Sequence, residues 1–316
     1  TGYTYTMNLN TSFTGDDNLY VRLKSGENGA QWKVKETYHI ETKDWSDALS
    51  IDKMWYTFPV GDNVTAFVGP RIENYYMYVT PSIYRPGALK SFKLGGNANF
   101  GASTDTGFGF KYETDGGFAI ASNVVSKNSD SDGMLGKNDH NKWDTQIAYT
   151  TDRWHVSGTL SNQQGWTGQA YNATAQAYDI ANADGEDATG YALRAYWRPD
   201  TTGAIPEVQL GYDVSTIDDA PTGFADEASG WMVGLGWKDL LIDGNRAGVA
   251  FGSRVSATSI VGGTSDPSED NSVWEAYYSF KVNDGVTVTP AIFGGSDVES
   301  EGKDVSGAVV LTEFRF

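Results

Sequence analysis

The sequence predicts an all-β fold, a transmembrane antiparallel β-barrel. Segments of alternating apolar and polar residues fill most of the 316 residues, and the connections between them alternate short with long. Outer-membrane barrels have short turns at one end and long loops at the other, whereas a soluble β-sandwich has no reason to sort its loops in this way. Aromatic residues also gather near the ends of the predicted strands on the apolar face, as the interfacial girdles of a barrel require.

Fifteen segments of the chain have this alternation, which is strictest in residues 3–13. Single-chain bacterial barrels have an even number of strands with both ends on the periplasmic side. We therefore predict sixteen strands, with the first one before Thr1 or, alternatively, a further strand within 28–42 or 86–104. The fifteen predicted strands are 3–13, 19–24, 51–60, 64–69, 106–112, 118–125, 143–149, 154–162, 191–197, 208–214, 231–238, 248–254, 274–282, 286–293 and 306–316.

One of the long connections differs from the rest of the chain. Residues 69–103 are long, aromatic and basic, contain three prolines and show no clean alternation. We predict that loop 70–105 folds inward and narrows a water-filled lumen; the alternative is a loop folded outward into trimer contacts. The other long loops are predicted at 25–48, 127–142, 163–188, 215–228 and 255–272.

Composition favours one unit, so we expect residues 1–316 to form a single barrel domain. The chain has no cysteine, which excludes disulfides and thiol chemistry, and no apolar run of eighteen residues, which excludes a transmembrane helix. A net charge of −18 argues against nucleic acid as a partner. No signal peptide is visible, and we expect the precursor to extend beyond Thr1.

The lumen can be assigned from the alternation, because every second residue of a strand faces inward. Basic side chains on this face either hydrate a wet interior and pair with acids, or form a basic rail that faces the loop and selects solutes by charge. The predicted lumen wall comprises Arg22, Lys24, Lys111, Arg194, Arg198, Lys238 and Arg254, with Lys281 on the same face. The predicted constriction comprises Arg71, Glu73, Arg85, Lys90 and Lys93, with Tyr75, Tyr76, Tyr78 and Tyr84 available to stack on sugars.

Catalytic, cofactor and metal sites are not predicted. His155 and Ser157 share a strand face, but no nucleophile turn or oxyanion motif accompanies them. The segment 128–133 resembles a calcium loop only faintly, because it lacks the distal bidentate acid. We therefore expect no enzyme and no cofactor.

Several segments resemble one protein family in residues, order and spacing. They are similar to the barrel of cyanobacterial outer-membrane porins, known as iron uptake porins and grouped with carbohydrate-selective porins. The segments are Thr11-Ser12-Phe13-Thr14-Gly15, Lys53-Met54-Trp55-Tyr56-Thr57-Phe58-Pro59, Gly69-Pro70-Arg71-Ile72-Glu73-Asn74-Tyr75-Tyr76-Met77, Pro81-Ser82-Ile83-Tyr84, Phe92-Lys93-Leu94-Gly95-Gly96-Asn97, Ala195-Tyr196-Trp197-Arg198-Pro199, Trp274-Glu275 and Val288-Thr289-Pro290-Ala291-Ile292-Phe293.

The resemblance implies a trimeric porin in the outer membrane of a Gram-negative-type bacterium, a cyanobacterium. It would pass small hydrophilic solutes and inorganic ions, including iron species or sugars. Cell-wall anchoring is expected only through an N-terminal surface-layer-homology domain that is absent from this chain. The competing prediction is a secreted, soluble, acidic β-sandwich or carbohydrate-binding module.

Overall fold

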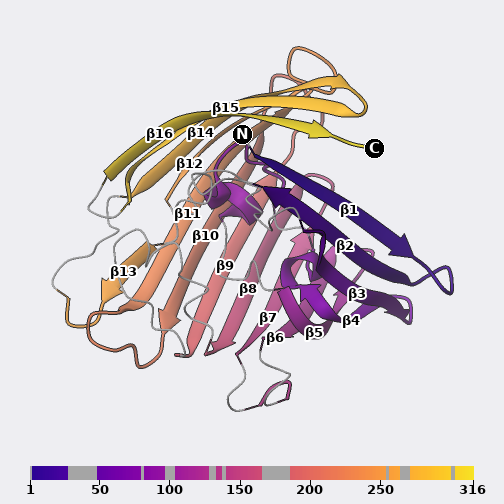
Figure 1. Cartoon of the computed structure of the whole chain (residues 1–316), viewed down its shortest axis with the longest axis vertical. Helices are drawn as coiled ribbons and strands as arrows, with labels where there is room; N and C mark the ends of the chain where they lie inside the picture. Colours follow the sequence, from indigo (N-terminus) through magenta and orange to yellow (C-terminus); the bar gives the residue numbers. More distant parts are fainter. Residues whose placement is uncertain are drawn as a thin grey trace.

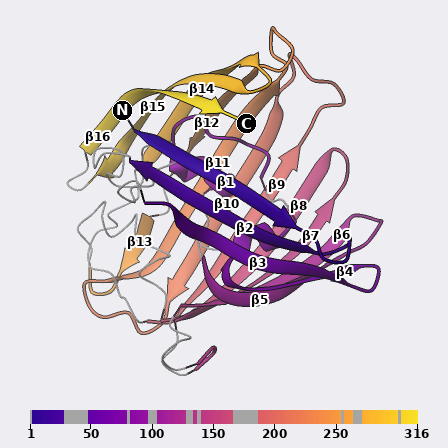
Figure 2. The same ribbon diagram turned by 45° about the vertical axis from the view of Figure 1, so that its right-hand side comes forward.

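The computed structural model is an antiparallel sheet that curls round on itself (Figures 1 and 2). The structure describes residues 2–27, 48–79, 82–96, 104–127, 133–136, 140–165, 186–253, 256–263, 271–299 and 303–316. In this part of the chain, no helix has the length and apolar character needed to cross a membrane.

Sixteen strands and two short 3-10 helices make up the described structure, as the predicted all-β class requires. The helices, η2 (Asn74–Met77) and η3 (Lys90–Gly95), both follow β4. The strands are β1 (Tyr3–Thr11), β2 (Asn18–Glu27), β3 (Ser50–Val60), β4 (Val64–Glu73), β5 (Thr104–Glu113), β6 (Phe118–Ser126), β7 (Asn141–Thr150), β8 (Trp154–Gln164), β9 (Ala188–Trp197), β10 (Glu207–Ile217), β11 (Ala225–Lys238), β12 (Arg246–Gly252), β13 (Ser256–Ile260), β14 (Ser272–Asn283), β15 (Val286–Glu299) and β16 (Lys303–Phe314).

One strand of the described structure, β13, is additional to the fifteen that the sequence predicts. Each strand pairs with the next along the chain, except that β12 and β13 both pair with β11 and β14 follows β12. β12 pairs with residues 232–238 and β13 with residues 225–229. The two short strands therefore lie one after the other along β11 and together occupy one position in the sheet. β13 lies in the predicted loop 255–272, and residues 86–96 contain η3 instead of a strand. Residues 28–42 lie outside the described residues.

The edges of the sheet are β1 and β16. Within the described ranges, β1 pairs with β2, β16 pairs with β15, and no pairing joins the two edges. Because neighbouring strands are antiparallel and the wall has fifteen positions, the edges run in the same direction. They come to lie on the same side of the molecule (Figures 1 and 2), so the sheet is an open barrel with a seam between β1 and β16.

The two faces of the sheet differ in the sense expected of a pore. In β7, Lys142, Asp144 and Gln146 point inward and are buried, whereas Trp143 and Ile147 point outward and are 45% and 55% exposed. A soluble sheet protein shows the reverse, with apolar side chains inside. The outward apolar rows are therefore suited to lipid and the inward polar rows to water or to a polar filling.

The first short turn is organised by a single carboxylate. Asp17 accepts hydrogen bonds from the Ser12 hydroxyl at 2.6 Å and from the N–H groups of Phe13 and Thr14 at 2.9 and 2.8 Å. The Tyr56 hydroxyl on β3 also donates to it. These hydrogen bonds, that of Ser12 first and that of Tyr56 second, hold the pKa of Asp17 well below its ordinary value of 3.8. The turn thus joins β1, β2 and β3 through one ionised group.

Candidate functional site: the constriction inside the barrel

The segment between β4 and β5 folds inward, as predicted. We call residues 74–96 the constriction loop; all but 80 and 81 are described. In both views the purple segment that follows β4 lies within the curve of the sheet (Figures 1 and 2). Wall side chains from β7 and β10 hold its first half. Asn74 donates to Asp144 at 2.7 Å, and the N–H groups of Val79 and Ile83 donate to Gln146 at 3.1 Å and Gln209 at 2.9 Å.

The turn at the middle of the constriction loop is held by Glu275, which points inward from β14. One carboxylate oxygen accepts the Tyr84 hydroxyl and the Gly87 N–H, both at 2.9 Å. The other accepts the N–H groups of Ala88 at 2.9 Å and Leu89 at 2.7 Å. The side chain of Glu275 is fully buried, and buried charges persist only where such hydrogen bonds compensate them. Glu275 therefore positions this part of the loop.

Apolar packing fixes the same turn against the wall. Leu89 and Phe92 are completely buried and belong to a cluster with Met232 and Phe293. A Cβ added to Gly87 would lie 2.6 Å from the Tyr277 side chain, so only glycine allows the loop backbone to approach this ring. The loop is thus seated by shape as well as by hydrogen bonds.

The end of the constriction loop rests on Arg194 of β9. The Arg194 guanidinium donates from Nε to the Leu94 carbonyl at 2.9 Å and forms a buried ion pair with Asp213 at 2.7 Å. Arg194, a predicted lumen residue, lies under the loop and is 2% exposed. It therefore supports the loop and does not face an open lumen.

Two predicted constriction residues lie on a strand. Arg71 and Glu73 belong to β4, which continues past Pro70 through a register shift between Gly69 and Ile72. A bulge accommodates proline because it leaves a residue without a ladder partner. Arg71 is exposed and donates to the Asp52 carbonyl at 3.4 Å, whereas Glu73 is buried.

The buried Glu73 belongs to a cluster of charges at the start of the loop. Glu73 forms an ion pair with Lys53, a residue that the sequence prediction did not include. Lys53 lies within electrostatic range of Arg22, Lys24 and Lys93. Arg22 pairs with Asp52 and donates to the Tyr76 hydroxyl at 3.0 Å. The alternation of β3 is shifted just before Lys53, because Arg22 is opposite Lys53 and Leu23 is opposite Ile51, which leaves Asp52 as an extra residue on β3.

The remaining predicted wall residues lie on several strands. Lys111 pairs with Glu113 on β5 at 2.7 Å, and Arg198 lies 3.4 Å from Glu207. Lys24 is buried, and Lys281 pairs with Asp284 at 2.8 Å. Arg254 lies outside the described residues, and Lys90 is half-buried at the start of η3. The structure thus distributes the charges of these predicted residues over more than one site.

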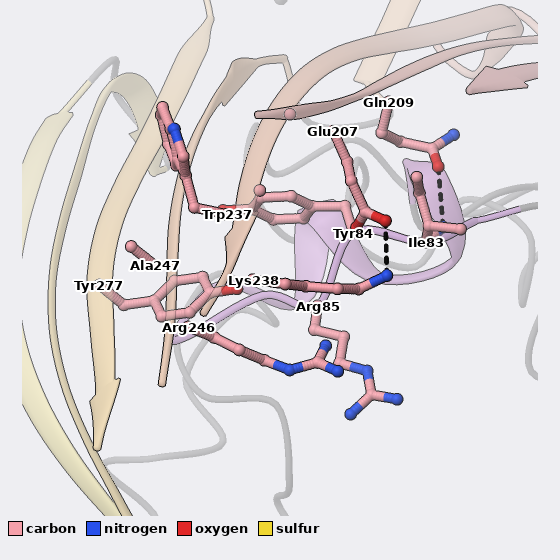
Figure 3. A pocket seen from close by; sticks show the side chains of 12 residues that line it. Ile83, Tyr84, Arg85, Glu207, Gln209, Trp237, Lys238, Arg246, Ala247 and Tyr277 are labelled. Carbon is pink, nitrogen blue, oxygen red and sulfur yellow. Dashed lines mark hydrogen bonds and ion pairs between the residues drawn. The ribbon is translucent and has the colours of Figure 1, made fainter. Parts of the chain in front are cut away.

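A pocket between the constriction loop and the wall brings together two predicted residues and one that was missed (Figure 3). Arg85 comes from the loop, Lys238 from the end of β11 and Arg246 from the start of β12. Lys238 donates to Glu207 at 2.5 Å, as the dashed line in Figure 3 shows. Arg246 shares the inward row of Gly248 and Ala250, so extending the alternation two residues backward identifies it. We refer to Arg85, Lys238 and Arg246 as the basic site.

The tyrosines proposed for sugar stacking separate into two groups. Tyr78 and Tyr84 are buried at 4% and 6% exposure, which leaves no ring face for a solute. Tyr76 is 44% exposed, stands 5.4 Å from Trp55 and is adjacent to Tyr75 at 4.9 Å. Exposed aromatic surface in the described part of the loop is therefore limited to its start.

The His155 and Ser157 pair has no access to a solute. The two side chains lie 2.9 Å apart, and His155 also contacts the Thr150 hydroxyl at 2.7 Å and stacks on Tyr196. His155 is completely buried. In the part of the chain that the structure describes, no group of three His, Asp or Glu side chains could hold a metal ion.

Known structures with this architecture are bacterial porins. No protein family and no curated protein matches the sequence. The fold resembles OprB of Pseudomonas putida, at 12% identity and a TM-score of 0.67 over 99% of this chain and 87% of that one. It also resembles an anion-selective porin from Comamonas acidovorans (9%, 0.63, 99% and 89%) and Salmonella typhi OmpF in complex with daunomycin (12%, 0.62, 99% and 89%). At these identities the similarity establishes a porin β-barrel fold and nothing beyond the fold.

Proposed function

We propose that this chain is an outer-membrane porin, in which small hydrophilic solutes and inorganic ions diffuse passively through a water-filled lumen. The observation that carries the proposal is the inward constriction loop, held against inner-wall side chains from β7, β9, β10 and β14. A loop seated inside a curled sheet narrows the passage through that sheet. The porin fold of the solved structures supports the same function.

The outward face supports placement in a membrane. Trp154, Val156 and Leu193 point outward and are 56%, 60% and 57% exposed. A soluble β-sandwich, the competing prediction, would bury such rows against a second sheet. Contact with lipid keeps these apolar side chains out of water, and pairing between strands satisfies the hydrogen-bonding groups of the backbone.

The finer features of the proposal have separate support. A cyanobacterial source, a homotrimer and iron or sugar solutes rest on the resemblance of segments such as 69–77 to cyanobacterial iron uptake porins. We retain residues 1–316 as one barrel domain, outer-membrane lipid as partner, and anchoring to the cell wall through another domain. Arg71, Glu73, Arg85, Lys90 and Lys93 remain the proposed constriction charges. Sugars would meet aromatic surface at Tyr75 and Tyr76.

Planar-bilayer recording tests the proposed pore. The purified chain is expected to form channels, and deletion of residues 74–90 is expected to raise single-channel conductance because it removes the loop from the lumen. An unchanged conductance would contradict the proposal that this loop narrows the lumen. Refolding of the chain as a monomer in plain buffer without detergent would contradict the porin itself.

A further inference from the structure

Two guanidinium groups of the basic site form no ion pair within the part of the chain that the structure describes. In the described ranges, no carboxylate lies within ion-pair distance of Arg85 or Arg246. Figure 3 shows both guanidinium groups projecting to the same side of the pocket, Arg85 from the loop and Arg246 from the wall. Partial desolvation and then the neighbouring charges of Arg246 and Arg315 lower the pKa of Arg85, so both of these guanidinium groups act on Arg85.

The third cation of the basic site, Lys238, pairs with Glu207, which also lies close to Arg198. Glu207 lies 2.5 Å from Lys238 and 3.4 Å from Arg198, so two cations compensate its charge. Glu313 lies within electrostatic range of Arg85, and Asp239 lies within electrostatic range of Arg246 and Lys238. Five cations therefore meet three carboxylates here (Arg85, Arg198, Lys238, Arg246 and Arg315 against Glu207, Asp239 and Glu313), and the local charge is positive.

The wall beside the basic site is open. Gly236 lines the pocket on the inward row of β11, two residues before Lys238, and a Cβ added there meets no atom within 4 Å. By contrast, Gly234 in the same row is covered by the Tyr84 ring at 2.8 Å. The wall is thus open beside the basic site and filled one step further along the strand.

We propose that Arg85, Lys238 and Arg246 form a binding site for small oxyanions, solutes that carry a carboxylate or phosphate group. Guanidinium groups recognise such groups through two parallel hydrogen bonds, and an ammonium adds a point charge. An oxyanion between Arg85 and Arg246 bridges the loop and the wall at the edge of the lumen that the loop is proposed to narrow. This inference rests on the proposed porin function and assigns its preferred solute class.

The test uses inorganic phosphate as the probe in bilayers that hold the intact protein. Wild-type channels are expected to favour chloride over potassium in a salt gradient and to lose chloride current when phosphate is added. In the double variant Arg85→Gln/Arg246→Gln the permeability ratio is expected to fall roughly tenfold, because two unit charges are removed within a few ångströms of the ion. The phosphate block is expected to weaken in parallel.

The matched control is Arg153→Gln. Arg153 pairs with Asp200 at 2.9 Å and lies over Trp197, outside the basic site, so its loss removes one positive charge without changing the site. A second variant, Gly236→Leu, keeps every charge but fills the open space; it is expected to weaken the phosphate block. Wild-type selectivity and phosphate block in the double variant would overturn the oxyanion site. Wild-type block in Gly236→Leu would also overturn it, whereas channels that never form would overturn the porin.

Discussion

Replacing Glu275 with alanine removes the acceptor that holds the middle of the constriction loop. Its carboxylate accepts one hydroxyl and three N–H groups at 2.7–2.9 Å. Hydrogen bonds to charged groups stabilise by about 1.5–3 kcal/mol each, which sums to roughly 6–12 kcal/mol for four. Water entering the emptied site re-solvates part of the donors, so we expect a net loss of about 4 kcal/mol. This shifts the equilibrium between seated and displaced loop roughly a thousandfold.

The apolar contacts of the loop oppose this displacement. Leu89 and Phe92 remain buried against the wall, and each contributes about 1.5–3 kcal/mol. We therefore expect a loop that leaves its seat for part of the time. Single-channel recordings of Glu275→Ala should show a higher mean conductance and added open-channel noise, and Glu275→Gln a smaller effect because it retains an acceptor.

The control for this prediction is Glu113→Ala. Glu113 is half-exposed, pairs with Lys111 on the same strand and lies on β5, away from the loop turn held by Glu275. Its loss should leave conductance and noise unchanged. If folded Glu275→Ala channels also matched the wild type in both quantities, the reasoning that Glu275 holds the loop in place would be refuted.

Two further predictions concern loop seating and turn stability. Gly87→Ala should displace the loop, because its Cβ would meet Tyr277 at 2.6 Å and such overpacking costs about 1–3 kcal/mol. The control is Gly158→Ala on the outward row of β8, where the added Cβ would meet Leu193 at 3.6 Å without a clash, and single-channel conductance distinguishes the two variants. Asp17→Asn should lower the urea midpoint near neutral pH. Because the pKa of Asp17 is depressed in the folded state, its stabilisation is present above the ordinary value of 3.8 and is lost as the pH falls below it. The difference from wild type should therefore shrink in acid; a constant difference across pH would contradict an ionised Asp17.

Strands and inward rows could be predicted because the alternation of side chains is a local property of extended backbone. The prediction failed where the backbone departs from regular extension. A bulge carries β4 past Pro70 and places Glu73 on a strand, and the line of β12 is interrupted before β13 resumes it. The five residues Ser256–Ile260 carry no aromatic side chain and only a weak alternation, so they were assigned to a loop.

The seat of the constriction loop could not be predicted, because it depends on contacts between distant residues. Glu275 is 186–188 residues away from the N–H groups that it accepts. The sequence analysis identified the loop as irregular and Glu275 as inward. Alternation contains no information on which inward side chain contacts which part of the loop. Arg246 was missed for a simpler reason, since its strand was started two residues too late.

The net charge of the chain does not predict the charge of its lumen. The value of −18 reflects acids concentrated in loops, whereas inward charges on neighbouring strands mostly find partners, as Arg22 does with Asp52 and Arg194 with Asp213. The register of the sheet allows such pairs because it places inward side chains opposite one another. The constriction loop has no such register, so Arg85 brings to the wall a charge that forms no ion pair with the described strand residues. A selective site is therefore expected where the loop meets the wall, and Arg246 faces Arg85 there.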